Sequence, residues 1–491
     1  MLIRKAAALI CAVFWATAPT AQTTVDIPFD EARQIAARAT LEGNPQLAID
    51  IATALLQANP NDRDAYLILA NALPQVGRAE DGRKAGQRAF ALSTSQVQRY
   101  GAARQTALAA ANEGRFTLSS LWLRRALIHA PNEAETKRTI ADAQQVARVN
   151  PWSTQLNFSV TPSGNVNGGT QDAQLTFDYL RLTPLDENTV LAEIAEFGGA
   201  NSVDAQALSG IILRYGITTQ YRAYETATSR VQLSFSYDAT RVRLSKEARD
   251  ARAAEFQASV EAANRGEGLP PEPLNGNRDF SSDIAQIGLR YDRIFGASLG
   301  TVELTLGQVR YAGDPYYAFG RVSLSYVRTL NDRQRLILSG FAERQDSADG
   351  PTADVDRKGA RATVVHQFSD GSQLSGTLGL TQSDSDRVNQ TSTQWSFQGR
   401  YSPRYRLGPA QFSVSAGLSK QEFPAYNVGL IPVLGGREDK VRSLGLDITF
   451  PDIQYAGFSP VVSLSAEKST SNISRFTRDT NNIGLNFVSS F

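Results

Sequence analysis

The chain has 491 residues, which is long enough for two or three domains. Its 50 Lys and Arg residues nearly cancel its 49 Asp and Glu residues, and a net charge of +1 argues against a dedicated nucleic-acid-binding protein, which carries a strongly basic face. A mean hydropathy of −0.28 argues against a bundle of transmembrane helices. It is compatible with a membrane β-barrel, in which half of each strand faces a polar lumen.

Residues 1–21 read as a secretory signal peptide. Arg4 and Lys5 supply the positive start, and residues 6–16 supply an apolar core that is too short to span a bilayer as a helix. We place the cleavage site within Ala18–Gln22. The protein is therefore expected to leave the cytoplasm.

The single cysteine, Cys11, lies inside that apolar core. A lipoprotein site at Cys11 is disfavoured because the apolar stretch continues through Trp15. The mature chain then contains no disulfide, thiolate metal site or cysteine nucleophile. No later run of about 18 apolar residues follows, so a mature protein that spans a membrane must do so with strands.

Residues 22–150 are predicted to form an α-solenoid of helical repeats. Between Phe29 and Arg148, Ala, Leu, Gln and Arg dominate and β-branched runs are absent. Gly43 and Gly77 are 34 residues apart, a spacing typical of tetratricopeptide-like pairs of helices. Such a stack presents a concave surface for protein binding, or it serves as a rigid spacer. The predicted helices span 29–41, 46–57, 64–76, 79–92, 95–112, 117–129 and 133–148.

At Asn150 to Trp152 the pattern changes, and residues 151–491 alternate between apolar and polar side chains. In Val231–Tyr237, for example, Val, Leu, Phe and Tyr alternate with Gln, Ser and Ser. Up to sixteen candidate strands can be counted. A soluble β-sandwich is the competing interpretation of this pattern.

The lengths of the connections favour a barrel over a sandwich. Short turns at 331–333, 369–372 and 405–409 alternate with long connections at 240–280, 346–358 and 420–440. Short periplasmic turns and long external loops are typical of outer-membrane barrels, and only a closed barrel satisfies every strand edge inside lipid.

The C-terminus adds a third argument. Ile483, Leu485, Phe487 and Phe491 fall on one face of an alternating segment, with Phe491 as the last residue. This resembles outer-membrane barrels, in which a terminal aromatic residue on the last strand directs insertion by the barrel-assembly machinery. Aromatic residues near the predicted strand ends would form the girdles of such a barrel, namely Tyr291, Tyr311, Tyr401, Phe450 and Tyr455.

An insertion at 242–280 interrupts the regular strands. Residues 246–265 form a highly charged, helix-like stretch, and a proline-rich segment follows them. By the alternation of the loops this insertion is extracellular. It is either a solvated surface segment, as charge runs usually are, or a plug or substrate-facing helix.

Sequence motifs for catalysis are absent from the mature chain. His129 ends a predicted helix, where the helix dipole explains it, and His366 lies on a predicted strand. The one G-x-S-x-G match, Gly296–Gly300, joins two predicted strands and not the strand and helix that a nucleophile motif requires. No phosphate-binding loop or metal-ligand spacing accompanies the histidines. We therefore expect no enzyme activity, no cofactor and no metal.

Four short segments resemble motifs of the surface lipoprotein assembly modifier family. Asn165-Val166-Asn167 looks like its Asn-Val-Asn segment, and Gly457-Phe458-Ser459-Pro460 looks like its Gly-Phe-x-Pro turn. The Arg-x-Asp stretch of the family corresponds to Arg437 and Asp439, and its Ser-Asn-Ile segment to Ser471, Asn472 and Ile473. The order signal peptide, helical repeats and barrel matches as well.

The resemblance implies a 14-stranded outer-membrane barrel of a Gram-negative bacterium, with the helical domain in the periplasm. It implies that the repeats capture a client secreted protein or lipoprotein and that the barrel gives it a route to the cell surface. The expected partners are the client, outer-membrane lipids and the barrel-assembly machinery, without nucleic acid. The competing function is a polysaccharide-export or general porin, whose repeat array is usually longer and whose lumen carries one sign of charge.

Overall fold

The computed structural model describes residues 27–176, 201–429, 431–453 and 458–489. The predicted signal peptide, Tyr455, Gly457 and Phe491 lie outside the described residues. The chain forms two compact units, residues 1–114 and residues 115–491.

The first unit consists of helices that begin and end where the sequence supplies caps. Asp62 accepts hydrogen bonds from the backbone N–H groups of Asp64 and Ala65, and Ser95 forms a capping box with Gln98. Gly43 and Gly77 follow α1 and α3 with φ of 80° and 81°, a conformation that favours glycine. The helices are α1 (Phe29–Leu41), α2 (Pro45–Ala58), α3 (Arg63–Gln75), α4 (Ala79–Leu92) and α5 (Gln96–Asn112).

Small residues allow these helices to pack closely. Ala36, Ala48, Ala52 and Ala65 are completely buried in the core that α1, α2 and α3 share. In this unit α3 contacts both α1 and α5, so alternate helices form one layer. The paired helices occupy the predicted positions, and the assignment to the tetratricopeptide type stays a prediction.

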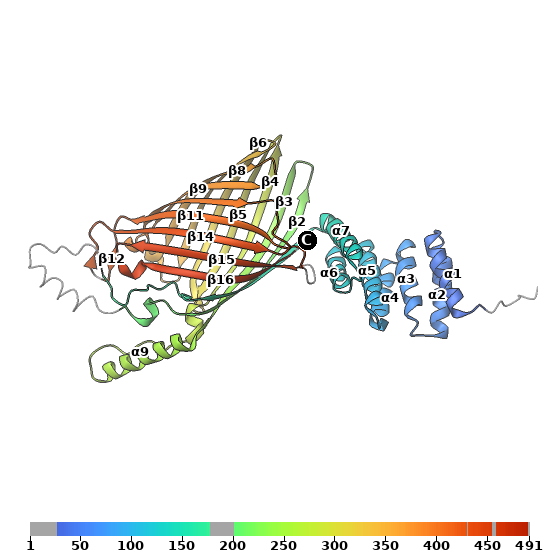
Figure 1. Cartoon of the computed structure of the whole chain (residues 1–491), viewed down its shortest axis with the longest axis horizontal. Coiled ribbons are helices and arrows are strands. Elements are labelled where there is room, and N and C mark those ends of the chain that lie inside the picture. The colour runs from blue at the N-terminus through green and yellow to red at the C-terminus, as the bar shows by residue number, and fades with distance from the viewer. Residues whose placement is uncertain (1–26, 177–200, 430, 454–457, 490–491) are drawn as a thin grey trace, which may run out of the picture. The chain divides into compact units, whose positions relative to one another are not determined.

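The second unit begins with α6 (Phe116–Ile128) and α7 (Glu133–Val149) and continues as a closed antiparallel barrel of fourteen strands among the described residues (Figure 1). The number implied by the family resemblance is confirmed, and the sixteen candidates counted from the sequence included segments outside the barrel. The strands are β1 (Trp152–Ser163), β2 (Gly210–Glu225), β3 (Ser229–Leu244), β4 (Ser282–Phe295), β5 (Ser298–Tyr311), β6 (Asp314–Asn331), β7 (Gln334–Ser347), β8 (Val355–Gln367), β9 (Gln373–Asp384), β10 (Ser392–Ser402), β11 (Gln411–Phe423), β14 (Arg437–Thr449), β15 (Phe458–Ser471) and β16 (Arg478–Ser489). A small hairpin of β12 (Asn427–Val428) and β13 (Ile431–Pro432) lies in the loop after β11.

The connections divide the two ends of the barrel into a short-turn rim and a long-loop rim. The short-turn rim carries the connections 226–228, 296–297, 332–333, 368–372, 403–410 and 450–457, and the chain enters β1 at this end. The long-loop rim carries 164–209, 245–281, 312–313, 348–354, 385–391, 424–436 and 472–477. Four of these, 312–313, 348–354, 385–391 and 472–477, are shorter than 403–410 and 450–457 of the short-turn rim. The predicted alternation of loop lengths therefore holds only in part: the three longest connections, 164–209, 245–281 and 424–436, all lie at the long-loop rim.

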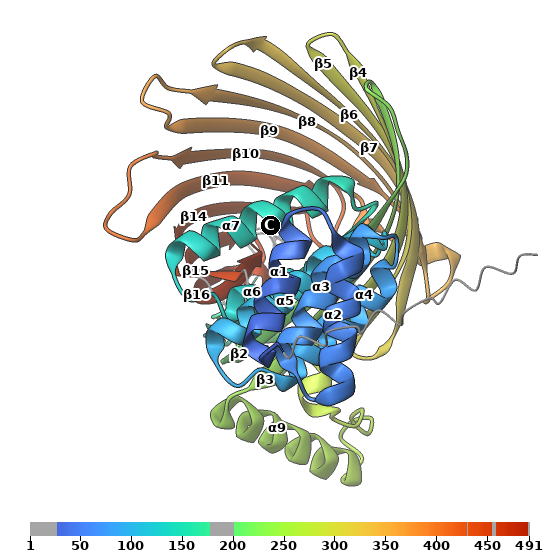
Figure 2. The same ribbon diagram turned by 90° about the vertical axis from the view of Figure 1, so that its right-hand side faces the viewer.

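The barrel wall has an apolar outer face and a polar inner face. On β5 the apolar Val302, Leu304 and Leu306 are 44–50% exposed, while Glu303 and Thr305 between them are less exposed. This order is the reverse of a soluble sandwich, in which apolar side chains fill the core, and it is the order of a membrane barrel. Figure 2 shows the strands following one another around the wall.

The predicted charged helix is α9 (Lys246–Asn264), in the connection after β3. Figures 1 and 2 both show it outside the ring of strands, at the long-loop rim. It therefore does not plug the lumen.

Candidate functional site

The first long loop is fixed by the Asn-Val-Asn segment. The Asn165 amide donates to the carbonyl of Gly169 at 2.7 Å and accepts from its N–H at 2.9 Å. The Asn167 amide donates to the carbonyls of Asp204 and Gln206 at 2.9 and 2.7 Å, and its oxygen accepts from the N–H of Leu208. Both asparagines thus add side-chain hydrogen bonds to the backbone pairing of the described part of this loop, such as that of Val166 with Leu208.

The helix α9 is anchored on that loop by Arg252, whose side chain is 4% exposed. Its guanidinium donates to Asp204 at 2.5 and 2.8 Å and to Asp279 at 2.7 Å, and it lies 4.9 Å from the ring centroid of Phe280. The hydrogen bond to Asp204 raises the pKa of Arg252 above its ordinary value, which keeps this buried group charged. The carboxylate of Glu255 also accepts from the N–H of Val203 at 3.0 Å.

Arg437 and Asp439 face the lumen near the long-loop rim. The Arg437 guanidinium donates to the Asp439 carboxylate at 3.0 Å, and both side chains are at least 86% buried. The same guanidinium lies over the rings of Phe423, Tyr426 and Phe476, at 3.3–5.2 Å from their centroids. A cation enclosed by aromatic faces joins three separate segments of the rim.

The Ser-Asn-Ile segment completes this corner. The Asn472 amide donates to the carbonyl of Gly436 at 2.9 Å, and its oxygen accepts from the N–H of Glu438 at 2.8 Å. Ile473 is completely buried, and the Ser471 hydroxyl accepts from its N–H. Thr170 of the first long loop donates to the carbonyls of this last loop at Ser474 and Thr477.

The sequence-predicted motif residues therefore fall into two groups. Asn165, Val166, Asn167, Arg437, Asp439, Ser471 and Asn472 lie at the long-loop rim, where the first and last loops meet. Phe458 and Pro460 begin β15 at the opposite rim, with Pro460 opposite Phe487 in register. Phe487 itself lies 6.4 Å from Phe158, centroid to centroid, across the closure of the barrel.

The closure between β1 and β16 is the shortest ladder in the barrel among the described residues. Its register pairs are Phe158 with Phe487, Ser159 with Asn486, Val160 with Leu485 and, after a gap, Ser163 with Asn482. By contrast, β15 and β16 pair continuously from Phe458 opposite Ser489 to Ser469 opposite Arg478. The Asn482 side-chain oxygen is buried without a hydrogen-bond partner in the described part of the chain, so this closure is incompletely satisfied.

The lumen carries both signs of charge. Glu343, whose side chain is 1% exposed, pairs with Arg321 and Arg357, and Arg400 pairs with Asp447 at 2.8 Å. Sequence reasoning missed Glu343 and Arg252. Alternation places Glu343 on the inner face, but no local signal separates Arg252 from the exposed charges of its helix.

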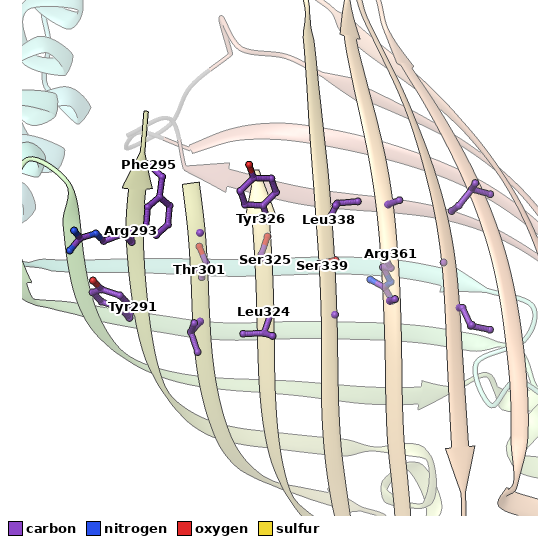
Figure 3. Close-up of a pocket in the computed structure, with 18 of the residues that line it drawn as sticks. Tyr291, Arg293, Phe295, Thr301, Leu324, Ser325, Tyr326, Leu338, Ser339 and Arg361 are labelled. Carbon is purple, nitrogen blue, oxygen red and sulfur yellow. The ribbon is translucent and has the colours of Figure 1, made fainter. Parts of the chain in front are cut away.

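The outer wall carries an apolar concavity of about 770 Å³, shown in Figure 3. The side chains of Tyr291, Tyr326 and Leu338 form its sides, and Gly340 and Ala360, which have little or no side chain, line its base. Because these side chains lie on the exposed apolar face, lipid chains fill such a concavity in a membrane. Tyr291, Tyr326 and Tyr401 stand near the short-turn rim, as expected of an aromatic girdle.

Other candidate sites have plain surroundings. The His366 ring packs edge-on against Phe368 at 4.7 Å and lies 3.4 Å from the amide of Gln334. Within the described residues, no cluster of three or more His, Cys, Asp or Glu side chains could hold a metal ion. In the same part of the chain, no helix is long and apolar enough to cross a membrane.

Comparison with known protein families gives a match for the C-terminal region. Residues 276–491, from η2 (Gly276–Phe280) to the C-terminus, match the family described as "Surface lipoprotein assembly modifier". The predicted resemblance is thereby confirmed for that region, and with the closed barrel it places the protein in the outer membrane. No curated protein sequence matches the chain.

Several solved structures match about two thirds of the chain at low sequence identity. They include a loop-deletion mutant of OmpT from Vibrio cholerae, with 9% identity, 69% of this chain and 99% of that chain covered and a TM-score of 0.33. OccAB3 of Acinetobacter baumannii has 10% identity, covers 68% and 98%, and has a TM-score of 0.33. A BenF-like porin from Pseudomonas fluorescens Pf-5 has 8% identity, covers 69% and 98%, and has a TM-score of 0.33.

Proposed function

We propose that the protein helps display lipoproteins at the cell surface, with the helical repeats holding the client in the periplasm and the barrel giving it a route outward. The match of residues 276–491 to the surface lipoprotein assembly modifiers carries this proposal. In this proposal the repeats bind the client and the barrel lets it pass, and no covalent bond is made or broken. The long-loop rim is the extracellular one, because long loops are external and short turns periplasmic in such barrels.

The lining beside the β1–β16 closure suits an extended polypeptide. The inward residues of β1 include Gln155, Asn157 and Ser159, and those of β15 include Ser463 and Ser465. Asn157 and Ser463 already donate to Asp238 and Asp447. The other hydroxyls and amides satisfy passing backbone groups without holding them tightly, because each exchanges one hydrogen bond with water for another. Such a surface accepts many sequences.

A lipid anchor needs a different path from its polypeptide. Acyl chains are expelled from a polar lumen, so a client whose polypeptide is inside the barrel must pass its anchor through the wall. The β1–β16 closure has the fewest backbone pairs to break among the described ladders. We assign the lateral exit to this closure.

A disulfide lock tests the route. The mature chain has no cysteine, and Ser159 and Asn486 are register partners across the closure. The double variant Ser159→Cys with Asn486→Cys, once oxidised, should abolish lipoprotein display on intact cells, and a reductant should restore it. The control pair, Thr363→Cys with Thr377→Cys, joins β8 and β9 at an equivalent inward position and should leave display unchanged. Full display by the locked closure would contradict the lateral exit.

Deletion of the gene tests the function itself. We expect protease shaving of intact cells to release fewer lipoprotein peptides from the deletion strain, with total lipoprotein unchanged, and a wild-type copy to restore them. Unchanged surface lipoproteins with loss of exopolysaccharide would instead establish the polysaccharide-export alternative.

A further inference from the structure

A row of charged residues crosses the outer wall beside the barrel closure, just above the apolar band. The charged members of this row are Arg442 on β14, Lys468 on β15 and Asp479 on β16, which are register partners. On β11 the row continues with the apolar Leu418, the partner of Arg442. The next outward row toward the short-turn rim is Ala416, Leu444, Ala466 and Asn481, and the row beyond it is wholly apolar: Val414, Leu446, Leu464 and Ile483.

The position of this row agrees with a lipid headgroup region. Phe458 and Lys468 are ten residues apart on β15, which is about 33 Å of strand at ~3.3 Å per residue. A strand tilted by roughly 40° spans about 25 Å along the barrel axis, the usual height of the apolar band. Arg442 and Lys468 therefore stand where the outer leaflet changes from acyl chains to headgroups.

A pocket of about 550 Å³ connects the charged row to the apolar wall. Phe397, Leu418 and Leu444 form its apolar sides, and Ala416 and Ala466 leave space between them. Arg442, Lys468, Asp479 and Asn481 line its upper part. Cationic groups above a narrow apolar slot match an amphipathic anion.

The cations of this pocket are poorly neutralised by the protein. No carboxylate lies within ion-pair distance of Arg442 in the described part of the chain, and Lys468 reaches Asp479 only at 3.7 Å. One row further out, Lys420 and Lys440 are both bound by Glu438, at 2.9 and 2.7 Å. The available positive charge is thus concentrated at Arg442 and Lys468.

We propose that this pocket binds one phosphorylated lipid of the outer leaflet. Its phosphate lies between Arg442 and Lys468, since guanidinium groups bind phosphate oxygens through paired hydrogen bonds. One acyl chain lies along Leu418, Leu444 and Ala466, and the amide of Asn481 donates to an acyl carbonyl. The bound lipid stands beside the closure, because Leu444, Ala466 and Asn481 also line the neighbouring groove that reaches Pro162 and Ile483.

Lipid binding to the full chain in detergent tests the proposal, with diphosphoryl lipid A as the probe and native mass spectrometry as the readout. The double variant Arg442→Gln with Lys468→Gln should bind the probe at least tenfold more weakly. Ala466→Phe fills the slot without changing charge and should weaken binding to a similar degree. The control Arg344→Gln removes an outward cation that three carboxylates already neutralise, and it should not change binding.

Two competition measurements distinguish a phosphorylated lipid from free phosphate and from other phospholipids. Millimolar inorganic phosphate should not displace the lipid, and phosphatidylcholine should not compete. Equal binding by wild type and the double variant would overturn the proposal, as would complete displacement by inorganic phosphate. Heat-dependent migration in gels verifies that each variant is folded before it is compared.

Discussion

The two rims of the barrel are built in opposite ways. At the short-turn rim, tight connections such as 296–297 and 332–333 join neighbouring strands through local contacts, for example the Asn331 side chain that accepts from the N–H of Arg333. At the long-loop rim, Asn167, Arg252 and Arg437 bind segments that are far apart in sequence through buried side-chain contacts. This difference indicates that short turns are sufficient to connect neighbouring strands of the barrel. The ordered long loops require specific side chains, which is why motif residues gather there.

Replacing Arg252 should have the largest effect. Arg252→Met leaves Asp279 without its cation, so the docking of α9 should lose about 2–3 kcal/mol, below the ~3–5 kcal/mol of a fully buried pair because Asp204 is 42% exposed. Hydrogen exchange of residues 246–264 should accelerate at least tenfold, with β3 and β4 unchanged. The matched control is Arg249→Met, an exposed arginine of the same helix. Equal protection in both variants would show that α9 is held by other contacts.

Replacing Asn167 should have a slightly smaller effect. Asn167→Ala removes three hydrogen bonds, each with a net value of about 1 kcal/mol, and it should destabilise the first long loop by roughly 2 kcal/mol. Limited proteolysis around residues 201–208 should become faster. Asn264→Ala, an exposed asparagine at the end of α9, serves as the control. An unchanged cleavage rate would contradict the role of Asn167 as a loop staple.

The tight connection 296–297 of the short-turn rim should respond only to backbone changes. Gly296 has φ of 57° with open space around its Cα, so Gly296→Ala should cost about 1 kcal/mol through strain alone. Gly296→Asn should cost less, because asparagine tolerates this conformation. The midpoint of thermal unfolding in detergent measures both. A larger loss for Asn than for Ala would mean that side-chain contacts, rather than φ, govern this rim.

The sequence predicts regular features well because their causes are local. Alternation in Val231–Tyr237 locates a strand, the change of period near Asn150 locates the junction where α7 ends and β1 begins, and the charges after residue 245 locate α9. The contacts at the long-loop rim have distant causes. Arg252 donates to Asp204, from which it is separated by 48 residues in sequence, and Thr170 donates to the carbonyl of Ser474 across 304 residues. Neither pairing therefore leaves a periodic signal in the sequence.

Local sequence patterns likewise do not predict how β1 and β16 close the barrel. Each of β1 and β16 alternates normally, and nothing in either strand shows how few pairs join them. The register of Ser159 with Asn486 depends on how the other strands bring the ends together. Family resemblance supplied the strand number that alternation overcounted, because a pattern of period two does not distinguish a barrel strand from an extended loop segment.

Single-cysteine labelling tests the assignment of the two rims most directly. The single cysteine, Cys11, lies in the predicted signal peptide, and Ala258 of α9 and Asp332 of a tight turn are both exposed. With a membrane-impermeant maleimide, Ala258→Cys should be labelled on intact cells, and Asp332→Cys only after the outer membrane is permeabilised. The reverse pattern, with Asp332→Cys labelled on intact cells and Ala258→Cys protected, would contradict the external position of the long-loop rim.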